Sequence, residues 1–259
     1  MLLRTLSIIL IILIFLYLLK TQIIEKYSEN DIRIYFINMN QNIDRWNKIK
    51  DTLPNLHRFE GINGKTLNPE KLIQQERLAE QNELLPGQLG CALSHMAVME
   101  AIKIQDEPYG LILEDDVIVP PNFTEIFDDI KGYFPENWDI IFLGGCNIYG
   151  KKVNEKIIRP IDNSGTKNLC MHAVLLNKKS ADKVLKCLTP LYRPIDSQLR
   201  EFFDDLVVFY LNPNIINQNK SLISNRRVLD GLPQSDYWKK HHMDITIEDF
   251  ANQDNLKYL

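Results

Sequence analysis

The sequence lacks several patterns that would assign it to a functional class directly. None of its four cysteines forms a C-x-x-C pair, which argues against a structural zinc site. It contains no glycine-rich loop of the P-loop type, which argues against nucleoside triphosphate chemistry. Its basic residues are scattered and its formal net charge is −4 at pH 7, so a nucleic-acid partner is not expected. It has no internal repeat and no low-complexity tract.

The composition is that of a globular protein. The 259 residues are 45% hydrophobic and 25% charged, which suits one large α/β domain. We expect four regions along the chain: a membrane anchor at 1–24, a linker at 25–31, a main domain at 32–229 and a polar tail at 230–259.

Apolar residues dominate the N-terminus. From Thr5 to Leu19 the chain is almost wholly Ile, Leu, Phe and Tyr, between Arg4 and Lys20. This run is shorter than the roughly 20 residues that span a bilayer, but neighbouring leucines and isoleucines extend it. A cleaved signal peptide is the alternative, although no alanine precedes Ala79 and no small-x-small site follows the run. We predict an uncleaved single-pass signal anchor with a cytoplasmic N-terminus, and a main domain in a secretory lumen or on a membrane face.

The cysteines leave two alternatives open. Cys91, Cys146, Cys170 and Cys187 could include one disulfide in a secretory lumen, or all four could be buried free thiols. For Cys91, which lies in an expected apolar helix, we favour the free thiol.

Hydrophobic periodicity predicts strands that alternate with helices. The expected strands are 32–37, 58–64 (running into a glycine turn), 109–113, 138–143, 169–176 and 206–211. The expected helices are 43–53, 69–82, 87–104, 122–133, 180–188 and 194–203. This order predicts an α/β fold with a mostly parallel sheet and helices on both faces. Ligands bind such sheets beyond the carboxyl ends of the strands.

The strongest local feature is an apolar run that ends in three acids. Residues 111–116 read Leu-Ile-Leu-Glu-Asp-Asp, so a buried strand is followed at once by Glu114, Asp115 and Asp116. Clustered carboxylates at a strand end are costly unless a cation neutralises them, and oxygen ligands suit Mg²⁺ or Mn²⁺. The alternative is a solvated acidic turn, which three acids alone would favour. Asn38, at the end of the first strand, is expected to share a crevice with these acids.

Seven segments occur along the chain in a recognisable order. They are Ile37-Asn38 with Asp44-Arg45, Arg58-Phe59 with Asn63-Gly64, Gly90 to His95, Leu111 to Val117, Trp138 to Gly144, Ser180 to Asp182, and Pro194 to Asp196. The most specific part is Gly-Cys-x-Leu-Ser-His followed by Leu-Glu-Asp-Asp. Together these segments resemble glycosyltransferase family 25, which includes lipooligosaccharide and collagen hydroxylysine galactosyltransferases. The sequence departs from the family pattern at Gln88, where we expect an acid, and at residues 170–173, where we expect more glycine.

The resemblance implies a GT-A type, Rossmann-like fold and an inverting transferase for glycan biosynthesis that uses a UDP-sugar and Mn²⁺ or Mg²⁺. Asp116 and then Glu114 would bind the metal, and the growing negative charge on the leaving diphosphate gives an independent reason for a cation there. Asn38, Arg45, Asp115 and His95 would bind or support the donor. Asp196 would be the base that accepts the proton of the acceptor hydroxyl.

Each of these assignments has a structural alternative. Asp196 could instead be a helix N-cap, Arg45 a surface arginine, and His95 a hydrogen-bonded core residue. At the level of the whole protein, the alternatives are an inactive relative that binds carbohydrate or serves as a scaffold, and another metal-dependent enzyme that acts on phosphates. The acceptor stays open between a glycan and the hydroxylysine of a collagen-like protein, as does the choice between galactose and glucose.

Overall fold

The computed structural model describes residues 31–161 and 165–219. The strands are β1 (Ile32–Asn38), β2 (Leu56–Glu60), β3 (Tyr109–Glu114), β4 (Val117–Ile118), β5 (Ile140–Cys146), β6 (Gly150–Lys152), β7 (Ile157–Pro160), β8 (Leu169–Asn177), β9 (Val208–Leu211) and β10 (Asn217–Gln218). The α-helices are α2 (Ile43–Ile49), α3 (Pro69–Gln74), α4 (Pro86–Ile104), α5 (Phe123–Lys131), α6 (Ala181–Cys187) and α7 (Ile195–Arg200). Short 3-10 helices are η2 (Asn40–Asn42), η3 (Gly64–Thr66) and η4 (Lys178–Ser180).

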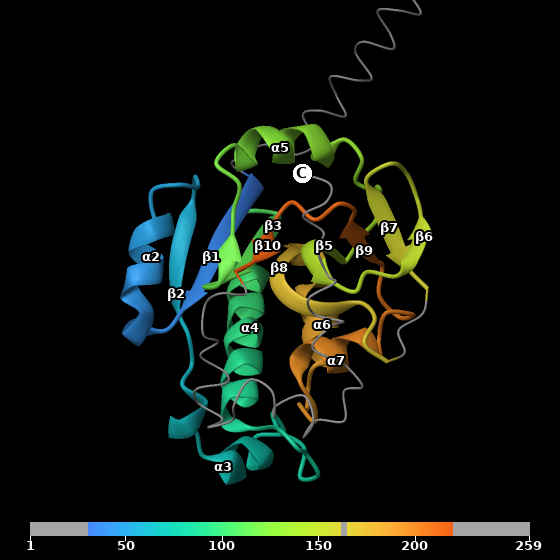
Figure 1. Ribbon diagram of the computed structural model, residues 1–259. Coiled ribbons are helices and arrows are strands. Elements are labelled where there is room, and N and C mark those ends of the chain that lie inside the picture. The colour runs from blue at the N-terminus through green and yellow to red at the C-terminus, as the bar shows by residue number, and fades with distance from the viewer. Residues whose placement is uncertain (1–30, 162–164, 220–259) are drawn as a thin grey trace, which may run out of the picture.

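Eight strands form one sheet in the order β2-β1-β3-β8-β5-β9-β7-β6 (Figure 1). The expected parallel pairing is present between β1 and its neighbours β2 and β3, and between β5 and β9. It does not hold across β8, which is antiparallel to both β3 and β5. A parallel strand needs a long crossover, usually helical, whereas the chain from β5 to β8 passes through the β6–β7 hairpin. The sheet is therefore mixed.

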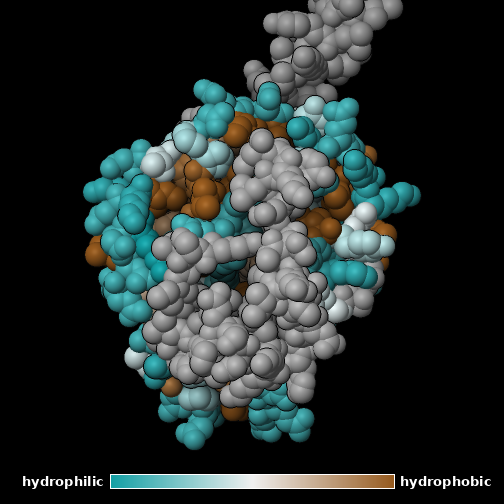
Figure 2. All heavy atoms as spheres, viewed as in Figure 1, coloured by the Kyte–Doolittle hydropathy of each residue, from teal (hydrophilic) through white to brown (hydrophobic). Residues whose placement is uncertain are grey.

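Helices cover both faces of the sheet, as predicted. In Figure 1, α5 lies above the sheet, and α4, α6 and α7 lie below it. Side chains alternate between these two layers along each strand, because successive residues of a strand point to opposite faces. In β3, Ile112 packs with α4 and α6, whereas Leu111 and Leu113 pack with α5. Figure 2 shows hydrophilic side chains around much of the outline of one face, with apolar patches between them.

Several element boundaries differ from the sequence expectation. Helix α3 ends at Gln74 rather than near residue 82, because Glu76 has a positive φ of 57° that interrupts the helical backbone. The short strands β4, β6, β7 and β10 were not expected, since two to four residues carry little periodicity.

The expected N-terminal anchor (1–24) and polar tail (230–259) lie outside the described residues. Within residues 31–161 and 165–219, no helix has both the length and the hydrophobicity needed to cross a bilayer.

Candidate active site at the carboxyl ends of β1 and β3

The ends of β1 and β3 meet at one edge of the sheet. Their parallel register pairs Ile37 with Glu114, so that Asn38 lies beside the acids that follow β3. The amide of Asn38 donates to Asp115 Oδ2 at 2.9 Å, and Arg45 of α2 forms an ion pair with Asp115 Oδ1 at 2.6 Å. The structure thus brings together Asn38 and Asp115, which the sequence predicted to share a crevice. It adds Arg45, which the family resemblance assigned to the donor site.

A second arginine, which sequence reasoning did not place in the site, approaches Asn38 from β2. Arg58 Nε donates to Asn38 Oδ1 at 2.9 Å, and Arg58 Nη2 donates to Asn40 Oδ1 at 2.8 Å. Asn38 is almost fully buried and lies between the two arginines. It accepts a hydrogen bond from Arg58 and donates one to Asp115, which in turn is paired with Arg45. Arg58 lies within a segment that resembles the family, but its sequence gave no sign that it faces Asn38. Two guanidinium groups at this edge make it suitable for an anion.

One buried oxygen of Asp116 has no hydrogen-bond partner within residues 31–161 and 165–219. Gln218 donates to its Oδ2 at 2.9 Å, whereas Oδ1 is buried and makes no hydrogen bond among the described residues. Burial and the nearby charge of Glu114 raise the pKa of Asp116 to about 7. An unsatisfied buried carboxylate oxygen is costly, and a bound cation would satisfy it. The carboxylate oxygens of Asp116 and Glu114 therefore fit the divalent metal that the sequence predicts.

Glu114 lies against α4. Its Oε1 is 3.0 Å from His95 Nε2 and 3.9 Å from Cys91 Sγ. His95 is almost fully buried, whereas Cys91 is partly buried and not in a disulfide. The expectation of a free thiol at Cys91 is confirmed, and the structure places His95 at the acidic cluster.

Glycines and a buried glutamine set the position of α4. A Cβ on Gly90 would lie 2.5 Å from the carbonyl oxygen of Ile62, so the first turns of the helix pack directly on the backbone after β2. Gln88, where the family resemblance led us to expect an acid, is buried and accepts a hydrogen bond from the backbone N–H of Leu85 through Oε1 at 2.9 Å. The amide oxygen satisfies this helix-start donor without burying a charge.

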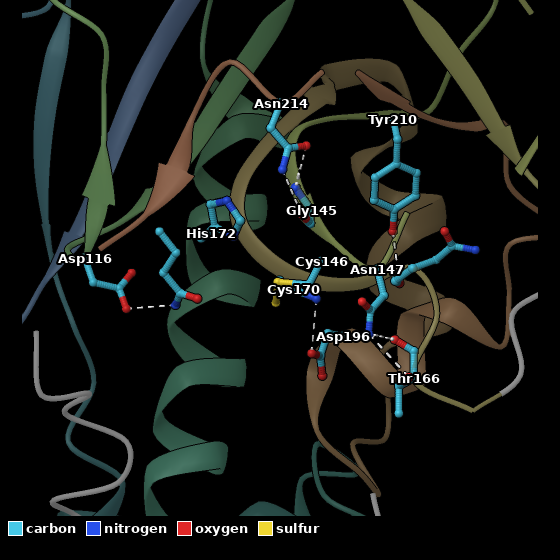
Figure 3. Close-up of a disulfide and its surroundings, with 12 residues drawn as sticks. Asp116, Gly145, Cys146, Asn147, Thr166, Cys170, His172, Asp196, Tyr210 and Asn214 are labelled. Atoms are coloured by element: carbon cyan, nitrogen blue, oxygen red, sulfur yellow. Dashed lines mark hydrogen bonds between the residues drawn. A yellow bond between two sulfur atoms is a disulfide. The ribbon is translucent and has the colours of Figure 1, made fainter. Parts of the chain in front are cut away.

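Asp196 is in the first turn of α7, but the N-cap of that helix is Pro194. The N-cap alternative therefore does not describe this residue. Its Oδ1 accepts from the backbone N–H of Ser197 at 2.8 Å, and its Oδ2 accepts from that of Cys170 at 3.3 Å. Figure 3 shows Asp196 and Asp116 on opposite sides of a disulfide.

That disulfide joins Cys146 at the end of β5 to Cys170 in β8, which resolves the open question about the cysteines. Next to it, His172 is buried, and its Nε2 is 3.2 Å from the carbonyl oxygen of Ile216. Burial lowers the pKa of His172 and so favours the neutral form of the ring. A Cβ on Gly144 would lie 2.3 Å from this ring, so the glycine is needed for the close packing. Sequence reasoning missed His172, because only the fold brings it to the acids.

The family described as "Glycosyltransferase family 25 (LPS biosynthesis protein)" matches residues 31–199, more than half of the chain. A curated protein of Aedes aegypti, named "Glycosyltransferase 25 family member", is 28% identical over 127 residues. The match covers 43% of this chain and 21% of that protein, so the chain spans about a fifth of the length of this relative.

The solved structures that are similar to this chain include the following two, both at low identity. The apo form of glycosyltransferase GlyE of Streptococcus pneumoniae TIGR4 is 12% identical, with a TM-score of 0.40 and coverage of 82% of this chain and 63% of that one. The apo form of mouse xyloside xylosyltransferase 1 is 11% identical, with a TM-score of 0.35 and coverage of 69% and 70%.

Proposed function

Since this chain belongs to glycosyltransferase family 25, we propose that it is a metal-dependent inverting transferase that moves a hexose, galactose by preference, from a UDP-sugar to a hydroxyl group. The acceptor would be a glycan or the hydroxylysine of a collagen-like protein. The protein would act at a membrane, to which residues 1–24 would anchor it with the N-terminus in the cytoplasm.

The observation that carries this proposal is the buried oxygen of Asp116, near Glu114 and the arginines, which has no partner in the part of the chain that the structure describes. A nucleotide diphosphate requires both a cation and hydrogen-bond donors, and this edge of the sheet supplies places for both. Glu114 and Asp116 would hold Mn²⁺ or Mg²⁺, both of which prefer oxygen ligands. Arg45, which is bonded to Asp115, and Arg58, which is bonded to Asn38, would donate hydrogen bonds to the phosphates.

The bound metal would supply positive charge that stabilises the departing diphosphate. During transfer, the acceptor oxygen forms a bond to the anomeric carbon, and the bond from that carbon to the phosphate oxygen breaks. Asp196 would accept the proton that the acceptor hydroxyl loses. The two backbone N–H groups that bond to Asp196 fix both of its oxygens in place for this step.

The test is release of UDP from a panel of UDP-sugars by the full chain, with and without Mn²⁺. We expect Mn²⁺-dependent release from one sugar, and at least a tenfold loss in Asp116→Asn, since the amide cannot neutralise the metal. Asp129→Asn, which alters an exposed carboxylate on α5, is the matched control and should retain activity. A folded protein that neither releases nor binds UDP with Mn²⁺ would contradict the proposal and favour a carbohydrate-binding relative without activity.

A further inference from the structure

A second group of metal ligands lies beside the acids. Cys91 and His95 are four residues apart on α4, so both side chains project from the same face of the helix. That face meets Glu114 at the end of β3, and Sγ, the imidazole nitrogen and a carboxylate oxygen all lie within 4.8 Å of one another. His95 is held rigidly, because it is almost fully buried and α4 packs tightly on the backbone near Gly64.

Two of the three ligand-atom separations are close to those of a tetrahedral zinc site. With a Zn–S bond of about 2.3 Å and Zn–N and Zn–O bonds of about 2.0 Å, ligand atoms are separated by roughly 3.5 Å for S and O and 3.3 Å for N and O. The observed separations are 3.9 Å from Cys91 Sγ to Glu114 Oε1 and 3.0 Å from His95 Nε2 to the same oxygen. We propose that Cys91, His95 and Glu114 bind Zn²⁺, with the fourth position left to water.

The ligand types separate this site from the one proposed for Mn²⁺ or Mg²⁺. A thiolate and an imidazole favour Zn²⁺, whereas Glu114 and Asp116 together offer only oxygen and favour the harder ions. On binding, the Cys91 thiol gives up its proton to solvent, and the Zn–S bond forms.

Glu114 belongs to both sites, which gives the zinc site a consequence for activity. This consequence rests on the proposed function. Since one carboxylate would have to serve two cations, Zn²⁺ should compete with Mn²⁺ and inhibit transfer.

Another cluster provides an internal contrast. Cys146, Cys170 and His172 also lie within 4.8 Å of one another, but the two sulfurs are bonded to each other and offer no thiolate while the disulfide is intact. Without reductant, only Cys91 and Cys187 among the described cysteines can therefore bind a metal as thiolates.

The first test uses the full chain, stripped of metal and kept free of reductant, and titrated with Co²⁺ as a spectroscopic substitute for Zn²⁺. We expect a near-ultraviolet thiolate-to-cobalt absorption that Zn²⁺ removes. Cys91→Ser should abolish this absorption. It should also weaken Zn²⁺ binding by at least 10- to 100-fold, the loss that is typical when a residue hydrogen-bonded to a metal ligand is replaced. Cys187→Ser, which alters the other free thiol, should keep it. Absorption that survives in Cys91→Ser would overturn the proposal.

The second test needs no variant and so does not depend on folding of a mutant. Zn²⁺, but not Mg²⁺, should slow alkylation of Cys91 at least tenfold, with Cys187 in the same sample as the control, both measured by peptide mass spectrometry. Equal alkylation of Cys91 with and without Zn²⁺ would refute the site. Zinc binding in a protein without transferase activity would leave this site intact and count against the proposed function alone.

Discussion

Asn38 and Asp115 are 77 residues apart in the chain and form a 2.9 Å hydrogen bond where β1 and β3 end together. Arg45 binds the other oxygen of Asp115, so both oxygens of this middle acid have partners. Asp116, by contrast, has one oxygen that no described residue satisfies. Adjacent acids in the sequence thus have different environments, and each can be tested separately.

Replacing Arg45 by alanine should destabilise the protein. Its ion pair with Asp115 is largely buried, with side chains 12% and 11% exposed, so the variant leaves a carboxylate uncompensated. We expect the free energy of unfolding in urea to fall by about 1–3 kcal/mol. The additional change Asp115→Asn should recover part of this loss, because it removes the unpaired charge. Arg159→Ala, on the exposed side of β7, is the control and should have little effect. An equal loss in Arg159→Ala would contradict the role given to the buried Arg45–Asp115 ion pair.

Asp196→Asn should slow transfer without impairing the donor site. The amide cannot accept the proton of the acceptor hydroxyl, and general bases contribute roughly 10²- to 10⁴-fold to turnover. We expect a loss of kcat in this range, with Mn²⁺-dependent UDP binding unchanged by calorimetry. If kcat and its pH profile match those of the parent protein, Asp196 is not the base.

Asp139 should make stability depend on pH. Burial opposes its ionisation, but hydrogen bonds from Lys183, Ser180 and the backbone of Val207 more than offset this and lower its pKa. Its contribution is therefore fully present above the unfolded pKa of about 3.9 and is lost as the pH falls through the lower folded value.

The variant Asp139→Asn should lower the free energy of unfolding at pH 6 by about 1–3 kcal/mol and by less near pH 3. Urea unfolding at the two pH values measures the difference. Asp129→Asn, an exposed carboxylate, is the control. A loss in Asp139→Asn that is the same at both pH values would show that ionisation of Asp139 does not contribute.

Gly90→Ala should displace α4. The new Cβ would lie 2.5 Å from Ile62 O and 2.7 Å from Gly64 N, and backbone atoms cannot move aside as a flexible side chain can. We expect a loss of about 1–3 kcal/mol or more by thermal unfolding. Gly132→Ala is the matched control, since its Cβ meets nothing within 4 Å and its φ of −65° suits alanine. A variant as stable as the parent would show that the helix has room to shift.

The sequence predicted local features well and long-range ones poorly. The strands that end at Asn38 and Glu114 were found because apolar runs and the polar residues after them are adjacent in the chain. The antiparallel direction of β8 was not found, since direction depends on the connection and not on the composition of a strand. Arg58, His172 and Gln218 were missed as site residues for the same reason. Gln218 reaches Asp116 across 102 residues, and no local pattern records that contact.

The pairing of β10 with β4 has a consequence for how the molecule is assembled. Asn217 and Gln218 join the strand directly after Asp116, and the backbone N–H of Asn219 donates to the Asp116 carbonyl at 2.6 Å. During synthesis, the acids emerge about a hundred residues before the segment that secures them. A fragment trimmed to residues 31–199 would retain all three carboxylates but would lack β9 and the β10 strand that pairs with β4. The last described segment thus completes a site whose charged residues were made long before it.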